Sequence, residues 1–193
     1  MSDTRDRIRE QALKLFIRKG YARTTIAEIE KAAGLAPRTG AFYRHFTDKE
    51  ELAAEIGATS IIETRQDLGF DGMLPLGDTR AELILIAKGY RKAGERQASL
   101  GPLLAEVRHL KKIRELEDKV DKDLAGALAE WLGTKPYARG LAPGPLFALL
   151  LTILGGWLFF LSKRRSAAAP TDLTDDLMLE QWAGFWSEIL DRD

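Results

Sequence analysis

The chain contains no cysteine and only two histidines among its 193 residues. Without cysteine it can form no disulfide, thiol nucleophile or cysteine-ligated metal site. The histidines, His45 and His109, lie in different regions, and neither has the spacing that is typical of metal ligands. A glycine-rich phosphate loop is missing as well. These gaps favour a protein that is not an enzyme and that uses no metal and no cofactor.

Other signals are also scarce. Residues 1–10 have no apolar core, so we predict no signal peptide and a cytoplasmic location. We find no internal repeat and no alternation of apolar and polar residues that would indicate strands. The composition, 45% hydrophobic and 30% charged, is that of an ordinary globular protein. The sequence therefore predicts an all-α fold.

Charge is unevenly spread although the whole chain is neutral. Residues 1–50 hold eleven Lys and Arg against seven Asp and Glu, an excess of about four positive charges that the remainder balances. Such an asymmetry indicates an anionic partner for the N-terminal part. Charge counting alone leaves a chance distribution open.

Residues 24–37 show the local pattern of a short helix and a tight turn. Thr25 and Glu28 have the spacing of a capping box, which predicts a helix start. Gly34 can take the left-handed conformation that ends a helix. Pro37 fits the first turn of a following helix, because that position needs no N–H donor.

The next helix is expected over about 38–46, with arginine, threonine, tyrosine and histidine side chains on it. Thr47 and Glu50 have the spacing of a second capping box, where a further helix would begin. Two short helices joined by a glycine turn form a helix-turn-helix pattern.

Three segments, IREQALKLF (8–16), KGYARTTIAEIEKAAGL (19–35) and FYRHFTDKEEL (42–52), resemble the tetracycline-repressor (TetR) family of bacterial transcription regulators. The resemblance covers about the first 55 residues. It implies a helix-turn-helix DNA-binding domain over 1–47 and an effector-binding and dimerisation domain over 48–193. The helix expected over 48–68 would link the two domains. Tyr43 lies nine residues after Gly34 rather than the family's usual seven, so this turn carries two extra residues.

A helix in the major groove reaches base edges with its N-terminal side chains. Arg38 would donate to guanine, Thr39 would contact a base, and Gly40 would allow close backbone approach. The resemblance implies phosphate contacts for Tyr43, His45 and Lys49, and for the backbone N–H groups at the helix start at Thr25. The predicted DNA-binding residues are Thr25, Arg38, Thr39, Gly40, Tyr43, Arg44, His45 and Lys49. Spacing alone leaves a core role open for Tyr43 and a structural role for His45, whereas Phe42 and Phe46 are expected in the core.

Periodicity and loop signals predict about nine helices in all. A capping box at Thr79 and Glu82 is expected to start one of them. The predicted helices cover about 4–19, 25–33, 38–46, 48–68, 79–97, 102–110, 113–132, 146–161 and 174–190.

The segment 146–161 is the most apolar in the chain, with sixteen residues, below the ~18–20 that cross a bilayer. We predict that it pairs with 174–190 and with the symmetry mates of both helices, with Gly156 allowing close approach. A plain core helix and membrane contact are the alternatives. The predicted dimer-interface residues are Leu150, Ile153, Gly156, Trp157, Trp182, Phe185 and Ile189.

A mainly apolar effector pocket is expected among the helices near 79–97, 102–110 and 113–132. Its candidate lining residues are Tyr90, His109, Trp131 and Phe147, which could equally fill an ordinary core. The favoured function is a homodimeric repressor that a small, mainly hydrophobic effector releases from a palindromic operator. The alternative is a helical binding or adaptor protein without operator recognition, which could associate with a membrane.

Overall fold

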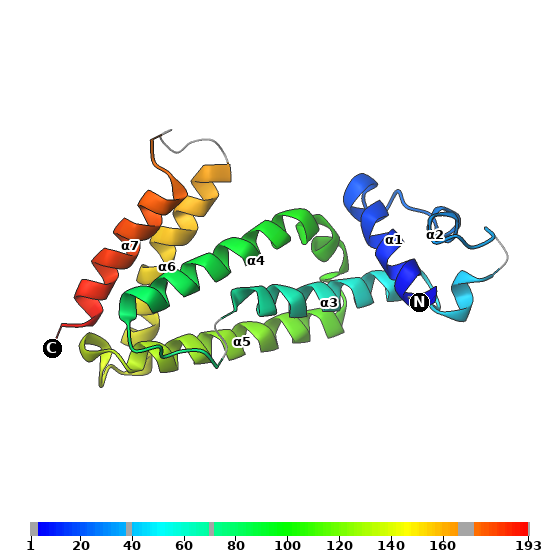
Figure 1. Cartoon of the computed structure of the whole chain (residues 1–193). Helices are drawn as coiled ribbons and strands as arrows, with labels where there is room; N and C mark the ends of the chain where they lie inside the picture. The colour runs from blue at the N-terminus through cyan, green and yellow to red at the C-terminus, as the bar shows by residue number, and fades with distance from the viewer. Residues whose placement is uncertain (1–3, 38–39, 70–71, 166–171, 193) are drawn as a thin grey trace. The chain divides into compact units, whose positions relative to one another are not determined.

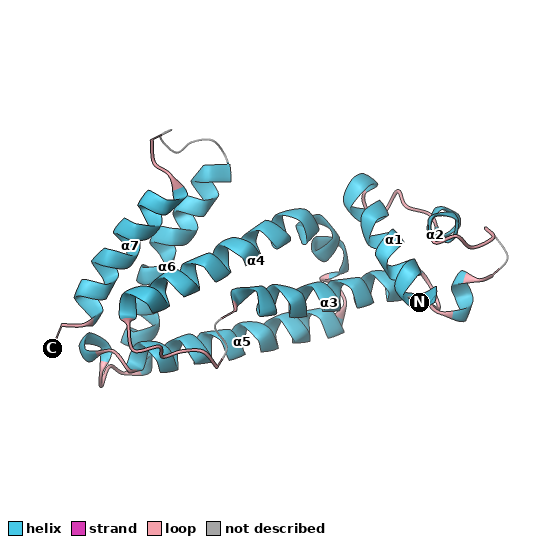
Figure 2. Ribbon diagram, in the orientation of Figure 1, coloured by secondary structure: helices cyan, strands magenta, loops and turns pink. Residues whose placement is uncertain are grey.

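The computed structural model describes residues 4–37, 40–69, 72–165 and 172–192, and every regular element in these ranges is helical (Figures 1 and 2). The expected all-α class is confirmed. The elements are α1 (Thr4–Lys19), α2 (Ile26–Ala32), the 3₁₀ helix η1 (Phe42–Arg44), α3 (Lys49–Leu68), α4 (Thr79–Val107), α5 (Lys111–Gly133), the 3₁₀ helix η2 (Pro136–Ala138), α6 (Pro143–Arg165) and α7 (Asp175–Leu190).

The described ranges therefore contain seven α-helices, and the expected number of about nine is wrong. The helices expected over 79–97 and 102–110 are one helix, α4, with Pro102 inside it. A proline removes one backbone hydrogen bond and strains the preceding turn. Leu103, Leu104 and Val107 are buried beyond it, so packing holds the helix through the proline.

The chain forms two compact units, Met1–Thr64 with Glu95–Val120 and Arg65–Gly94 with Asp121–Asp193. The first unit has a core in which Ile8 and Phe16 of α1 are buried with Ile29 and Phe46. A Cβ at Gly57 of α3 would lie only 3.1 Å from the Val107 side chain, so a glycine allows this close packing. The predicted division at residues 47 and 48 concerns function and stays a prediction.

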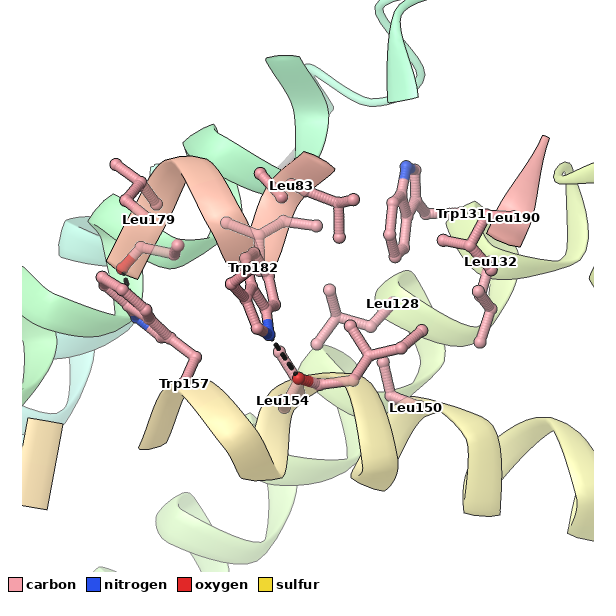
Figure 3. Close-up of a cluster of buried hydrophobic side chains, with 14 of the residues drawn as sticks. Leu83, Leu128, Trp131, Leu132, Leu150, Leu154, Trp157, Leu179, Trp182 and Leu190 are labelled. Carbon is pink, nitrogen blue, oxygen red and sulfur yellow. Dashed lines mark hydrogen bonds between the residues drawn. The ribbon is translucent and has the colours of Figure 1, made fainter. Parts of the chain in front are cut away.

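The second unit is organised around tryptophans (Figure 3). The indole N–H of Trp157 donates to the carbonyl of Ala87 at 2.9 Å, and that of Trp182 donates to the carbonyl of Ile153 at 2.8 Å. Each ring is thus both buried and hydrogen-bonded, which is what a buried tryptophan requires. These bonds join α6 to α4 and α7 to α6.

Two of the predicted capping boxes are wrong by one residue. The carboxylate of Asp48 accepts the N–H of Glu51 at 2.7 Å, so Asp48 and not Thr47 caps α3. Likewise Asp78 accepts the N–H of Ala81 at 3.0 Å at the start of α4. An aspartate stands beside a threonine in both places, and either type can cap a helix.

Glu82, the expected partner of Thr79, instead lies fully buried in the second unit. Its carboxylate accepts the indole N–H of Trp131 at 2.9 Å and the backbone N–H of Gly77 at 3.0 Å, and it pairs with the buried ammonium of Lys135. Burial raises the pKa of Glu82, but these donors outweigh it and hold the pKa below its ordinary value. The carboxylate therefore joins the start of α4 to the end of α5.

Candidate nucleic-acid interface

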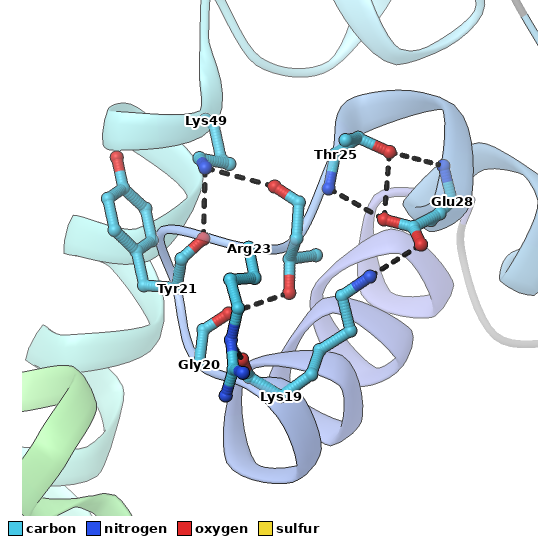
Figure 4. Close-up of polar contacts among 8 residues, drawn as sticks. Lys19, Gly20, Tyr21, Arg23, Thr25, Glu28 and Lys49 are labelled. Atoms are coloured by element: carbon cyan, nitrogen blue, oxygen red, sulfur yellow. Dashed lines mark hydrogen bonds and ion pairs between the residues drawn. The ribbon is translucent and has the colours of Figure 1, made fainter.

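The start of α2 is built as the sequence predicts (Figure 4). Thr25 has an extended backbone and accepts the N–H of Glu28 at 3.3 Å, while its own N–H donates to the Glu28 carboxylate at 2.9 Å. The capping box of Thr25 and Glu28 is confirmed. A phosphate at this end would have to bind the other first-turn N–H groups, which have no intrahelical acceptors.

Lys19 at the end of α1 adds a cation to this cap by pairing with the carboxylate of Glu28. The ammonium of Lys19, together with the N–H and hydroxyl of Thr25, lowers the pKa of Glu28 to about 2. Glu28 is therefore ionised throughout the neutral range. The partner could not be predicted from local spacing, because Lys19 and Glu28 belong to different helices.

Lys49 at the start of α3 donates hydrogen bonds to the turn between α1 and α2 (Figure 4). Its ammonium donates to the carbonyls of Tyr21 and Thr24, each at 2.9 Å, and lies 4.3 Å from the centre of the Tyr21 ring. Two of its three donors are thereby used within the chain. Phosphate contact by Lys49 stays a prediction, but the residue also has a structural role that the sequence did not indicate.

The turn after α2 ends as expected and then departs from the prediction. Gly34 has a φ of +70°, and the N–H of Leu35 donates to the carbonyl of Glu30 at 2.8 Å, which is a glycine-terminated helix end. The helix expected over 38–46 is wrong in its described part, where only the three-residue η1 forms. Gly40 has a φ of +76°, which an α-helix cannot contain. Arg38 and Thr39 lie outside the described residues.

The aromatic side chains in and just after η1 differ in burial. Phe42 and Phe46 are buried in the core, as predicted, and the N–H of Phe42 donates to the buried carboxylate of Glu30 at 3.2 Å. Tyr43 is 60% exposed, so the core alternative for this residue is wrong. Arg44 is also exposed, and His45 is half-buried. Two consecutive residues therefore present a phenol and a guanidinium to solvent.

Arg5 of α1 contacts the residues that follow η1. Its guanidinium donates to the carbonyl of His45 and to the carboxylate of Glu55, and it lies 4.2 Å from the centre of the Phe46 ring. One side chain thus connects α1, the residue after η1, and α3. A lone arginine on a charged helix gives no sequence signal for such a role, so this residue was missed.

The predicted effector residues are divided between the two units. His109 belongs to the first unit, where its Nδ1 lies 2.9 Å from the carbonyl of Glu106. Tyr90, Trp131 and Phe147 belong to the second unit. Trp131 is 3% exposed, Phe147 is 48% exposed, and burial raises the pKa of the half-buried Tyr90 to about 12. The effector pocket stays a prediction.

The predicted interface residues fall into two groups. Leu150, Ile153, Trp157 and Trp182 are buried within the second unit itself, so they hold α6 and α7 to their own chain. Phe185 is 59% exposed, Ile189 is half-buried, and a Cβ at Gly156 would lie 3.8 Å from the Trp182 ring. The outward apolar face consists of other residues as well: Phe147, Leu151, Leu158 and Phe159 of α6, and Leu177 and Phe185 of α7.

Within the single chain the helix α6 is buried on one side and exposed on the other. From Pro143 to Arg164 it is long and apolar enough to cross a membrane, with a mean hydropathy of 2.0, and 28% of the most apolar stretch is buried. Helices from the cores of soluble proteins can have the same length and composition. An apolar face of this kind indicates a partner surface.

Among the described residues no group of three His, Asp or Glu side chains is arranged to hold a metal ion. Residues 8–56 match the family described as "Bacterial regulatory proteins, tetR family". The match spans α1, α2, η1 and the first part of α3.

The probable HTH-type transcriptional regulator ArpR of Pseudomonas putida is 30% identical over 179 residues, which cover 81% of this chain and 80% of that protein. Other curated regulators match with higher identity over the N-terminal segment alone. The matched segment of this chain covers 21%, 24% and 17% of the length of the first three of these relatives. Their activities as whole proteins therefore enter only as proposals.

Two solved structures show the same fold. A TetR-family regulator from Shewanella sp. PV-4 matches with a TM-score of 0.61 and 18% identity, covering 97% of each chain. A structure named superantigen PfiT matches with a TM-score of 0.69 and 19% identity, covering 100% of this chain and 98% of that one. Identities this low show the fold and leave function to the residues of the site.

Proposed function

This chain belongs to the TetR family of bacterial regulatory proteins, and we propose that it is a repressor that binds a palindromic operator as a homodimer and is released by a small, mainly hydrophobic effector. TetR-family regulators bind DNA and act as dimers. The observation that carries the proposal is the match of residues 8–56 together with the exposed Tyr43 and Arg44 at the end of that segment.

The proposed DNA contacts use the exposed edge of the first unit. The phenol of Tyr43 and the guanidinium of Arg44 would donate to phosphates, with His45 beside them. Lys49 and Thr25 would support them, although much of their hydrogen-bonding capacity serves the turn and the cap. Arg38, Thr39 and Gly40 would supply the base contacts.

The proposed dimer uses the outward apolar face of α6 and α7. Phe147, Leu151 and Leu158 recur at helical spacing on α6, and a Cβ at Gly155 would meet nothing within 4 Å. Gly155 thus lies open on this face, so we propose it as a point of close approach beside the predicted Gly156. A two-fold interface would bury the same face on both chains and set the spacing of the two DNA-binding ends.

The proposed effector site lies in the second unit, near Tyr90, Trp131 and Phe147. Aromatic side chains with a single phenol suit a mainly apolar ligand. An effector that binds more tightly to a dimer with wrongly spaced DNA-binding ends would release the operator.

A protection footprint of the purified protein on the DNA upstream of its own gene tests the proposed function. We expect two protected half-sites of related, inverted sequence, with centres about 10 base pairs apart or a multiple of that. A scrambled duplex of the same composition is the control. Protection that is equal on both duplexes would contradict operator recognition and would favour the helical adaptor instead.

A further inference from the structure

A cavity of about 380 Å³ that is open to solvent lies in the first unit, between α1, α3 and the second half of α4. Its apolar surface comes from Leu13 of α1, Ile56 of α3 and Leu100 of α4. A volume in this range is that of small-molecule sites in proteins. The cavity is separate from the proposed effector site, which belongs to the second unit.

A buried hydroxyl on the wall lacks a partner. Ser60 of α3 is 3% exposed, and its Oγ makes no hydrogen bond among the described residues. Its neighbour Thr59 also lines the cavity but satisfies its hydroxyl by donating to the carbonyl of Glu55 at 2.9 Å. A buried polar group without a partner is unfavourable. A ligand that reaches Ser60 would remove that cost.

The charges around the cavity favour a cation. Three carboxylates, those of Asp6, Glu10 and Glu63, line it together with two guanidiniums. Both guanidiniums are engaged by carboxylates: Arg9 lies 3.1 Å from Asp6, and Arg96 lies 2.7 Å from Glu63. The third carboxylate, that of Glu10, pairs with Lys14 at 2.6 Å, but these side chains are 59% and 60% exposed, and such a surface pair is weak. An anionic ligand would have to compete with the two arginine pairs. An ammonium group would meet one more carboxylate than guanidinium on the wall and would have to displace only this weak pair.

We propose that this cavity binds a small organic amine with an aromatic or alicyclic body. The hydrocarbon body packs against Leu13, Ile56 and Leu100, and the polar group bonds Ser60 and the carboxylates. Because α1 and α3 both form the wall, the ligand's affinity depends on how α1 packs against α3. Occupation therefore alters DNA affinity, a consequence that rests on the proposed function.

Three probes with one ring system test the binding chemistry by calorimetry on the full chain: 1-naphthylmethylamine, 1-naphthalenemethanol and 1-naphthoate. We expect one site per chain, with the amine binding at least tenfold more tightly than the carboxylate and the alcohol between them. Equal affinity of amine and carboxylate, or no binding of the amine, would overturn the proposal.

Blocking variants test the location. Thr59→Phe on α3 and Leu13→Phe on α1 each place a ring in the cavity, and each should weaken amine binding at least tenfold. The matched control is Ile62→Phe, which adds the same ring to α3 at a position that is 47% exposed and outside the cavity. Two variants are used so that one remains informative if the other melts early. Unchanged binding in a folded blocking variant would place the site elsewhere.

Fluorescence anisotropy of labelled upstream DNA then tests the coupling. Saturating 1-naphthylmethylamine should shift the DNA affinity of the unaltered chain at least threefold and leave that of Thr59→Phe unchanged. A shift of equal size in both would overturn the coupling, because the amine would then act on the DNA itself. Absence of DNA binding without amine would contradict the proposed function alone, and the calorimetric result would stand independently.

Discussion

Among single residues, Glu82 shows how one buried carboxylate can hold two distant segments together. It receives donors from the loop before α4 and from Trp131 and Lys135, some fifty residues later in the chain. A buried pair of this kind adds little over an apolar replacement, but removing one partner leaves an uncompensated charge. The residue therefore sets the arrangement of the second unit more than its total stability.

We predict that Glu82→Gln lowers the free energy of unfolding by about 3–5 kcal/mol, because the buried Lys135 loses its counter-charge. The control is Glu180→Gln, which breaks the pair with Arg80, where both side chains are about half exposed. That change should cost less than about 1 kcal/mol. Urea denaturation measures both. Equal small losses would show that the buried pair is not formed.

The lowered pKa of Glu28 makes the cap of α2 sensitive to acid. Because the folded pKa is about 2 against an ordinary 4.5, Glu28 contributes stability above pH 4.5 that is lost as the pH falls toward 2. Carbon NMR of the carboxyl group should show Glu28 still ionised at pH 3.5. Lys19→Met should raise its midpoint, since Lys19 is the largest cause of the shift. A midpoint near 4.5 in the unaltered chain would refute the capping geometry.

Among the elements, close helix packing depends on Gly57 of α3 and Gly89 of α4, and the sequence does not reveal the importance of either. A Cβ at Gly89 in the middle of α4 would lie 2.1 Å from the carbonyl oxygen of Leu68, at the end of α3. A backbone atom cannot move aside as a side-chain tip can. This contact fixes α4 against the end of α3 within the second unit.

Replacing glycine by alanine should therefore have opposite effects at two helical positions. Gly89→Ala should destabilise the chain by about 3 kcal/mol or more, because it forces the helices apart. Gly126→Ala on α5, where a Cβ meets nothing within 4 Å, should stabilise it by ~0.5–1 kcal/mol. Thermal melting followed by circular dichroism gives both shifts, and a Gly89→Ala protein as stable as the parent would rule out this packing.

Local signals predicted those features that depend on a few neighbouring residues. The Thr25–Glu28 cap and the helix end at Gly34 each lie within a short segment, and both are confirmed. The cap at Asp78 was missed because the choice between Asp78 and Thr79 depends on Glu82, whose partners are remote in sequence. The structural roles of Lys49 and Arg5 were missed for the same reason.

The helix expected over 38–46 failed for a different reason. Pro37 and the residues after it suggested a continuous helix, but Gly40 lies within that segment and has a left-handed backbone. The periodic apolar positions Phe42 and Phe46 still reach the core through one 3₁₀ turn. A hydrophobic pattern thus predicted burial correctly without predicting the helix.

Across the whole molecule, the outward apolar face of α6 and α7 decides between a soluble dimer and a membrane-bound chain. Gly155→Arg should give monomers in light scattering, because a charged side chain would stand at the point of close approach. Gly126→Arg, at an equally open position on α5, is the control and should remain dimeric. If Gly155→Arg leaves the dimer intact, the interface lies elsewhere. Detergent-dependent solubility of the parent would favour membrane contact.

DNA binding through the exposed edge at Tyr43 and Arg44 is the central claim, and the salt dependence of operator affinity tests it most directly. Anisotropy titrations at several salt concentrations should give a linear fall of log K with log salt, with a slope of about −0.9 for each phosphate contact. Arg44→Gln should reduce that slope by about one per chain and weaken binding to all sequences alike. An affinity that does not change with salt, or an Arg44→Gln slope equal to that of the parent, would contradict the account.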